Sequence, residues 1–330
     1  MTAVFNRFPW LRRWETLLFI LLLVVIGVNA QVSEFYFESD NISNIFRLSI
    51  EKAIVVVVMA FVIINAEIDL SVASIMGLAA SVLAFSYEAG QPLVMGILLA
   101  LIVGLVCGVI NGYFIAYLEI PSLVVTLAGL IMYRGAARIL LEDRSVGDYP
   151  EWFTGIAQNE IIGPFPLTIF IFIGLFVLAY VILQYTTFGR YVYAIGNNRE
   201  GSEYAGIDVK RVKMTIFVAS AVIATVAGIF YAARLGNVRA NAAEGFELDI
   251  ITIVLLGGVS IFGGKGTMMG VGLSLLLVLN MRNGMSLTNV NGNTQTSVVG
   301  LLLILSVLIP NMAQSIQVWW ARRVIGDGKT

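Results

Sequence analysis

Histidine is absent from this sequence of 330 residues, and Cys107 is its only cysteine. These absences exclude catalytic schemes with histidine as the general base, a disulfide within the chain and zinc sites of the Cys/His type. Charge is scarce as well: 12% of the residues are charged, whereas a soluble domain carries about 25%. With 58% hydrophobic residues and a mean hydropathy of +0.89, the chain cannot cover its surface with polar side chains. We therefore predict an integral membrane protein.

The sequence contains no stretch polar enough for a separate soluble domain, so we predict one transmembrane domain over residues 1–330. The net charge of −1 indicates no nucleic-acid partner. Near the start, Arg7, Arg12 and Arg13 precede an apolar run, as in a signal peptide. However, residues 29–37 (NAQVSEFYF) offer no small-residue cleavage site. We expect this first apolar run to be retained as a membrane span.

A helix that crosses the hydrocarbon of a bilayer needs roughly 20 residues, with about 17 to 25 tolerated. Apolar runs of suitable length occur ten times, which predicts an all-α membrane protein with about ten transmembrane helices. The runs cover approximately residues 16–31, 49–66, 71–88, 92–117, 122–141, 167–185, 212–233, 248–263, 267–283 and 297–316.

The distribution of Lys and Arg predicts that both termini lie on the cytoplasmic side, where such residues are enriched. With ten spans, that side receives twelve of the twenty basic residues: Arg7, Arg12, Arg13, Arg190, Arg199, Lys210, Arg211, Lys213, Lys265, Arg322, Arg323 and Lys329. The opposite side receives mostly acids: Glu34, Glu38, Asp40, Glu142, Asp143, Asp148, Glu151, Glu160, Glu244, Glu247 and Asp249.

Residues 186–211 form the longest segment expected on the cytoplasmic side, and they are polar and basic. Asn197 or Asn198 is a suitable cap for a short helix over residues 200–205, and Gly206 would end it. The segment is either a solvated connector or a docking element for a cytoplasmic partner.

Glycine is concentrated in residues 255–270, LLGGVSIFGGKGTMMG. A phosphate-binding loop of the G-x-x-x-x-G-K-[ST] type is excluded here, because Val259 stands at its first position and Gly266 follows Lys265. Small residues permit close helix approach, and irregular backbone at membrane depth must be covered by protein or line a watery path. We predict a structural glycine motif made of Gly257, Gly258, Gly263, Gly264 and Gly266.

Four stretches occur in order along the chain: IDLSV at 68–72, INGYFIAYLEIPSLVVTLAGLIMYRGAA at 110–137, GRYVYAIGNNREGSEYAGIDVKRVK at 189–213 and ELDIITIVLLGGVSIFGGKGTMMGVGL at 247–273. Together they resemble the membrane permease subunits of bacterial ABC importers in the ribose-permease branch. That branch also serves other monosaccharides and the autoinducer-2 system. The resemblance covers nearly the whole chain from about residue 40.

The resemblance implies a membrane subunit that transports a monosaccharide or similar small polyol and is not itself an enzyme. It implies a core of two permeases, either two copies of this chain or this chain and a paralogue, in the bacterial inner membrane. Two cytoplasmic ATPase subunits would hold ATP and magnesium, with no cofactor or metal in this chain, and a periplasmic binding protein would deliver the substrate. The segment after the sixth span would be the coupling helix, with contact residues Asn197, Glu200, Tyr204, Ala205, Gly206 and Ile207.

The chain departs from the family pattern at two places. The family usually has Gly-Gly before Ile-Asp-Leu-Ser and a further glycine in Ser-Val-Gly-Ser, whereas this chain has Ala66, Glu67 and Ala73. The additional carboxylate of Glu67 leaves the identity of the sugar open.

Two carboxylates, Glu67 and Asp69, stand between two apolar runs. Asp69 precedes a span that begins near Ser71, where a carboxylate accepts from free backbone N–H groups and meets the positive end of the helix dipole. An ionisable residue at membrane depth is also a functional candidate, and residues 65–70 would then form a gate whose polar groups contact sugar hydroxyls. Glu67 either lies at the interface or pairs with a basic residue of a neighbouring helix.

Further polar residues lie within the predicted spans. Thr126 bonds either its own helix backbone or the substrate, and Asn111 beside Gly112 suits a close helix contact as well as a ligand contact. We expect Arg134 and Arg138, one turn apart, to extend to the outer face and meet acids of a docked binding protein. The predicted substrate path or gate comprises Asn65, Asp69, Ser71, Asn111 and Thr126.

The alternative is a proton-coupled secondary transporter in which Glu67 and Asp69 form the relay. Secondary carriers often contain inverted repeats, and the two halves of this sequence show no convincing repeat. A membrane-embedded enzyme is less consistent still, because no pair of nucleophile and base is visible.

Overall fold

The longest helices follow the longest apolar runs. The computed structural model describes residues 14–142, 144–302, 304, 305 and 308. Among these residues, five helices of 19 to 27 residues are long and apolar enough to cross a bilayer. The prediction of an all-α membrane protein is confirmed. The five helices are α2 (Trp14–Val32), α6 (Leu93–Ala116), α7 (Ser122–Leu141), α9 (Leu167–Tyr185) and α12 (Val209–Leu235).

Three apolar helices are shorter than a full span. α4 (Ile50–Ile64), α5 (Val72–Glu88) and α13 (Phe246–Leu256) contain 15, 17 and 11 residues. At 1.5 Å per residue, α13 covers about 17 Å of a hydrocarbon layer about 30 Å thick. The apolar run over residues 248–263 is therefore not one continuous helix: the helix ends at Leu256, and Gly258 has a φ of +84°.

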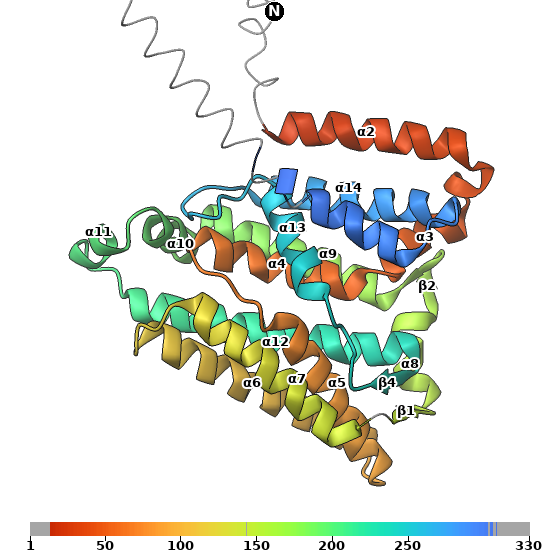
Figure 1. Ribbon diagram of the computed structural model, residues 1–330, viewed down its shortest axis with the longest axis horizontal. Helices are drawn as coiled ribbons and strands as arrows, with labels where there is room; N and C mark the ends of the chain where they lie inside the picture. Colours follow the sequence, from red (N-terminus) through yellow and green to blue (C-terminus); the bar gives the residue numbers. More distant parts are fainter. Residues whose placement is uncertain (1–13, 143, 303, 306–307, 309–330) are drawn as a thin grey trace, which may run out of the picture.

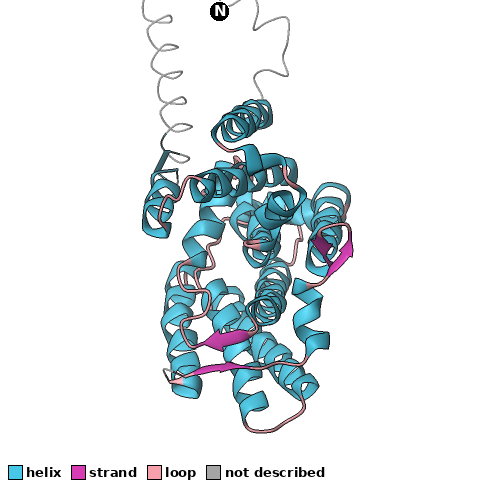
Figure 2. Cartoon of the chain, turned by 90° about the vertical axis from the view of Figure 1, so that its right-hand side faces the viewer, coloured by secondary structure: helices cyan, strands magenta, loops and turns pink. Residues whose placement is uncertain are grey.

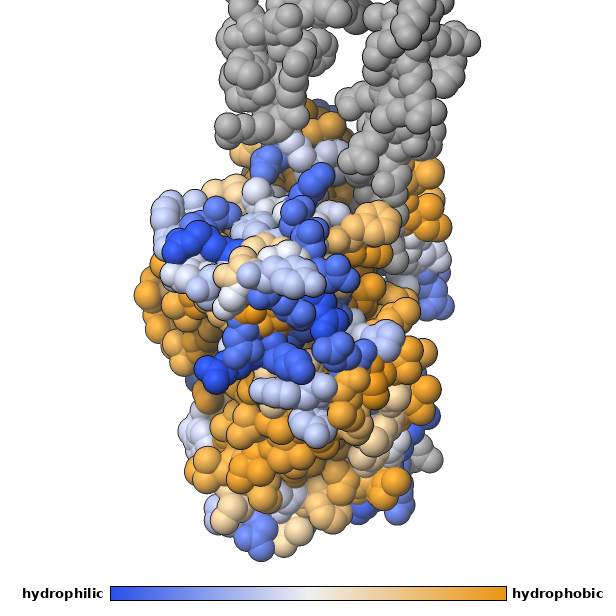
Figure 3. All heavy atoms as spheres, turned by 90° about the vertical axis from the view of Figure 1, so that its left-hand side faces the viewer, coloured by the Kyte–Doolittle hydropathy of each residue, from blue (hydrophilic) through white to orange (hydrophobic). Residues whose placement is uncertain are grey.

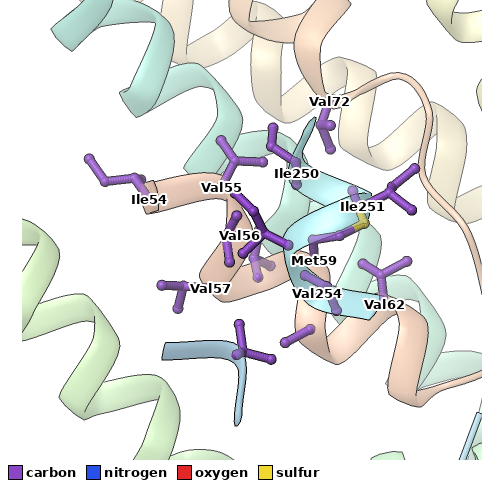
Figure 4. Packing of buried hydrophobic residues seen from close by; sticks show 14 of the residues in the cluster. Ile54, Val55, Val56, Val57, Met59, Val62, Val72, Ile250, Ile251 and Val254 are labelled. Atoms are coloured by element: carbon purple, nitrogen blue, oxygen red, sulfur yellow. The ribbon is translucent and has the colours of Figure 1, made fainter. Parts of the chain in front are cut away.

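The centre of the molecule is α4, in which every residue is buried. It contacts α9, α12, α13 and α14 (Met268–Leu287). The aliphatic side chains of α4 and α13 pack together, among them Met59, Ile251 and Val254 (Figure 4). A helix that is apolar on all sides is stable only when other helices surround it, which explains why α4 occupies this position.

The remaining helices lie on two sides of α4 (Figure 1). On one side α2 packs along α14, and on the other α5, α6, α7 and α12 pack together. Small residues set the spacing of α6 and α12, because a Cβ added at Gly108 would lie 2.8 Å from the Cβ of Ala221. The glycines of α6 thus allow its backbone to approach α12 closely.

The two ends of the bundle carry different elements (Figures 1 and 2). One end holds α10 (Thr187–Asn197) and α11 (Arg199–Tyr204). The opposite end holds two short antiparallel strand pairs, which the sequence did not predict. These pairs are β1 (Ser145–Gly147) with β4 (Asn237–Arg239), and β2 (Glu160–Ile162) with β3 (Phe165–Pro166). Further elements include η2 (Glu34–Phe37), α3 (Ser39–Arg47) and α8 (Glu151–Gln158).

Several predictions about the whole chain stay predictions: ten spans, cytoplasmic termini and one domain over residues 1–330. The tenth predicted span, 297–316, lies largely outside the described residues. Also outside them are the charged residues Arg7, Arg12, Arg13, Asp143, Arg322, Arg323 and Lys329, which enter the orientation argument.

Candidate functional site

An irregular segment separates α4 from α5 inside the protein. The end of α4 is closed by the backbone N–H groups of Ala66 and Glu67, which donate to the carbonyls of Ile63 and Val62 at 3.0 and 3.1 Å. This pair of hydrogen bonds requires the left-handed backbone conformation at Ala66, whose φ is +62°. The requirement explains why glycine, which adopts such angles without steric cost, is the usual family residue at this position.

Asp69 lies in this segment and is fully buried. Its Oδ1 accepts from the backbone N–H of Ser71 at 2.9 Å and from the hydroxyl of Ser71 at 2.6 Å. Its Oδ2 accepts from the hydroxyl of Ser220, on α12, at 2.9 Å. The predicted contact with a backbone N–H at the start of α5 is present, and the carboxylate also joins α5 to α12.

The network continues from Ser71 into α6 and α7. The amide nitrogen of Asn111 donates to the hydroxyl of Ser71 at 2.9 Å, and the hydroxyl of Tyr133 donates to Asn111 Oδ1 at 2.9 Å. Tyr133 is not among the residues predicted from the sequence, although a buried phenol in an apolar helix needs a hydrogen-bond partner. Asp69, Ser71, Asn111 and Tyr133 thus form one chain of side chains, which we call the Asp69 network.

Thr126 and Asn65 lie beside this network. The hydroxyl of Thr126 lies 2.8 Å from the carbonyl of Ser122 and 3.1 Å from that of Ile68. Asn65 donates to the carbonyl of Val192, on α10, at 3.4 Å. The predicted path residues are all at most 2% exposed and contact their own chain. Their part in a substrate path stays a prediction.

Glu67 forms an ion pair with Lys213 of α12. Both side chains are about one-tenth exposed, at 11% and 9%. Of the two alternatives left open by the sequence, the structure shows pairing with a neighbouring helix.

The glycine-rich residues after α13 pack against two other segments. The N–H of Gly264 donates to the carbonyl of Ile64, at the end of α4, at 2.8 Å. The hydroxyl of Tyr193, on α10, donates to the carbonyl of Gly266 at 2.8 Å. A Cβ added at Gly196 of α10 would lie 1.8 Å from the same Ile64 carbonyl. Residues 257–266, which we call the glycine loop, therefore lie between the end of α4 and α10.

At each position of the predicted glycine motif, the local backbone conformation or packing explains why glycine is present. Gly258, Gly263, Gly264 and Gly266 have φ values of +84°, +80°, +70° and +139°, which side chains rarely tolerate. A Cβ at Gly257 would lie 2.7 Å from the Cα of Val271 in α14.

α11 is a short capped helix at one end of the molecule (Figure 1). The side chain of Asn198 accepts from the N–H of Gly201 at 2.9 Å, and the left-handed Gly206 lies two residues beyond the helix. Tyr204 is 93% exposed. Asn197, Glu200, Ala205 and Gly206 are also exposed, and Ile207 is half-buried. Hydrophilic residues gather near the middle of this face, with hydrophobic residues around and below them (Figure 3).

The structure also contains a buried ion network that was not predicted from the sequence. Glu51 pairs with Arg234 at 2.6 Å, and Asp249 pairs with Lys52 at 2.5 Å and with Arg282 at 2.7 Å. These pairs join α4, α12, α13 and α14. The adjacent Glu51 and Lys52 at the start of an apolar run could have indicated ion pairs with other helices, because unpaired charges at such a position are costly.

Arg134 meets acids of its own chain, and its predicted contact with a docked binding protein stays a prediction. Its side chain is 17% exposed and lies 3.4 Å from Glu247 and 3.6 Å from Glu244 of the same chain. Arg138 is 60% exposed and lies 3.6 Å from Glu244. Burial beside these acids favours pairing within the chain over extension into solvent.

The sequence matches known transport proteins along most of its length. Residues 41–307 match the family described as the permease component of branched-chain amino acid transport systems. The chain is 31% identical over 297 residues to the ribose import permease protein RbsC of Haemophilus influenzae, covering 89% of this chain and 92% of that protein. It is 31% identical to the xylose transport system permease protein XylH of the same organism, with 83% and 89% covered.

A further relative is the autoinducer 2 import system permease protein LsrD of Escherichia coli strain SMS-3-5, at 29% identity with 94% and 96% covered. No solved structure matches. The chain belongs to the family of ABC sugar importer permeases, in the branch that includes the ribose and autoinducer 2 permeases. It is thus a multi-pass membrane protein and a transport subunit.

Proposed function

We propose that this chain is the membrane-spanning subunit of an ATP-driven importer in the bacterial inner membrane. Its substrate is a monosaccharide or a similar small polyol, delivered by a periplasmic binding protein. The similarity to a ribose import permease and a xylose transport permease supports this substrate class. ATP and magnesium are held by separate cytoplasmic ATPase subunits, and the core contains a second copy of this chain or a paralogue.

The observation that carries this proposal is the exposed end of α11. Tyr204 is 93% exposed, and large aromatic side chains are frequent anchors of protein interfaces. Ala205 and Gly206 beside it are small and also exposed, so a partner surface can approach the backbone closely. We assign contact with the ATPase to Asn197, Glu200, Tyr204, Ala205, Gly206 and Ile207.

The contacts of α10, which precedes α11, connect the proposed ATPase interface mechanically to the interior of the membrane domain. α10 is packed onto the glycine loop through Gly196 and Tyr193, and the glycine loop is bonded to the end of α4 through Gly264. Asn65 adds a direct bond from the segment after α4 to α10. A rigid displacement of α10 and α11 would therefore shift residues 65–71 and the Asp69 network, which we propose to act as the gate.

Uptake into vesicles that contain the complete importer tests the energy source. Import should require ATP on the ATPase side and should persist when an uncoupler removes the proton gradient at constant ATP. Collapse of uptake under the uncoupler would instead favour the proton-coupled alternative through Glu67 and Asp69. Both carboxylates are already satisfied within the chain, Glu67 by Lys213 and Asp69 by two serines, which supports a structural role for them.

A further inference from the structure

A polar hollow is formed by residues of α7, β4 and the segment that follows β4. Figure 1 shows β1 and β4 at the end of the molecule opposite α10 and α11. Its volume is about 500 Å³, enough space for a monosaccharide with water around it. None of the residues predicted for the substrate path lines it. The hollow is lined by Arg138, Glu142, Arg239, Ala240, Asn241 and Glu244.

The charges of this polar hollow balance. Among the described residues that line it, Arg138 and Arg239 contribute two positive charges, and Glu142 and Glu244 contribute two negative charges. A site for an inorganic anion or cation would carry an excess of the opposite sign. A balanced wall of guanidinium, carboxylate and amide groups instead offers both donors and acceptors, which suits a neutral ligand with many hydroxyl groups.

The charged groups of the wall remain available to a ligand. Arg138 and Glu244 lie 3.6 Å apart, longer than a normal hydrogen bond, and their side chains are 60% and 45% exposed. Among the described residues, Arg239 makes no ion pair, and it is exposed. Hydroxyl groups of a sugar can therefore bond these side chains without first breaking a tight internal pair.

Contacts outside the hollow nevertheless restrain the segments that carry its lining residues. Arg134, which is largely buried, lies 3.6 Å from Glu244 and 3.4 Å from Glu247. Arg239 is fixed in β4 opposite Ser145 of β1. Glu142 has a φ of +52° and Ala243 one of +60°, conformations that side chains adopt at a cost and that cluster at ligand clamps. The backbone that carries these side chains is thus fixed before a ligand binds, which lowers the ordering cost of binding.

We propose that the polar hollow is a binding site for a neutral monosaccharide before it enters the membrane interior. This inference rests on the proposed function for its substrate class. Arg138 and Arg239 donate to sugar hydroxyls, Glu142 and Glu244 accept from them, and Asn241 does both. Hydrogen bonds with ionised groups are stronger than those between neutral groups, so a few such contacts retain a sugar at millimolar concentration without hindering its release.

Binding is tested directly on the purified full-length chain in lipid nanodiscs, by saturation-transfer NMR with D-ribose and D-xylose as probes. At least one sugar should give a signal, and Arg239→Gln or Glu142→Gln should weaken its binding by about fivefold or more, the value of one such hydrogen bond. Arg47→Gln serves as the matched control, because Arg47 lies in α3, outside the lining of the hollow, and donates to the carbonyl of Gln158. Unchanged thermal unfolding of each variant would show that the fold is intact.

Transport supplies a second readout. In the complete importer, Arg239→Gln should raise the KM for sugar with subunit assembly intact, whereas Arg47→Gln should leave the KM unchanged. Absence of a signal with both sugars, or equal signals in the wild-type chain and both variants, would overturn the proposal. So would weaker capture of the periplasmic binding protein by Arg239→Gln with unchanged sugar binding, since the hollow would then be a protein contact. Energy coupling is measured separately with the uncoupler, so failure of that test does not alter the binding result.

Discussion

Glu67 and Lys213 form an ion pair across 146 residues of sequence, between the segment that follows α4 and the helix α12. The pair lies beside the Asp69 network, whose Asp69 also bonds α12 through Ser220. Two neighbouring carboxylates therefore hold the break between α4 and α5 onto the same helix. One is neutralised by a cation, and the other is satisfied by neutral donors.

Removal of one partner of this pair should cost more stability than removal of both. Lys213→Met leaves the carboxylate of Glu67 without a partner at about one-tenth exposure, and breaking such a buried pair costs about 3–5 kcal/mol. The double variant Glu67→Gln/Lys213→Met should recover most of that loss. Thermal unfolding of the purified variants in detergent measures both effects.

The same double variant separates a structural from a proton-relay role of Glu67. If the pair is structural, uptake should persist in the double variant at a rate close to that of the wild-type chain. Loss of uptake in a stably folded double variant would contradict the structural role.

Asp69→Asn should impair transport less than Asp69→Leu. Asparagine keeps an oxygen that accepts from the N–H of Ser71, and its amide can donate to the hydroxyl of Ser220, whereas leucine removes every bond. Each orphaned buried polar group costs about 1–3 kcal/mol. Sugar uptake is measured at equal amounts of protein in the membrane, and equal loss in the two variants would show that the charge itself is required.

Gly196→Ala should disrupt the contact between α10 and the end of α4. The added methyl would lie 1.8 Å from the carbonyl of Ile64 and 2.7 Å from the nitrogen of Gly264, so backbone must move, at a cost of about 1–3 kcal/mol. Gly174→Ala in α9 is the matched control, because a Cβ there meets nothing within 4 Å. Unfolding temperature and sugar-stimulated ATPase activity of the assembled importer should fall only for Gly196→Ala.

Ala205→Glu should release the ATPase while leaving the permease folded. Ala205 is exposed next to Tyr204, so a glutamate there fits in this chain alone but places a larger charged group in the proposed interface. Glu200→Ala, at an exposed position of α11, should change little, because charges at an interface rim contribute little affinity. Co-purification with a tagged ATPase subunit measures both, and full recovery of the ATPase with Ala205→Glu would argue against this docking surface.

Long apolar runs predicted α6, α7, α9 and α12 to within a few residues, because a continuous helix satisfies its own backbone and needs only length and hydrophobicity. The cap at Asn198 and the stop at Gly206 were also predictable, since both act through backbone groups within a few residues. The interruption after α13 was harder, because its apolar sequence reads as a continuous span. There the helix ends where Gly257 packs on Val271 of α14.

The sequence by itself determined that this chain is an α-helical membrane protein and which transport family it resembles. Both conclusions depend on composition, the length of apolar runs and the order of motifs. Only the tertiary structure decided that Glu67 pairs with Lys213, that Asp69 bonds Ser220, and that Arg134 faces Glu247 rather than solvent. A buried charge is stable only with a partner, and when many residues separate the two, the packing of helices selects which partner it meets.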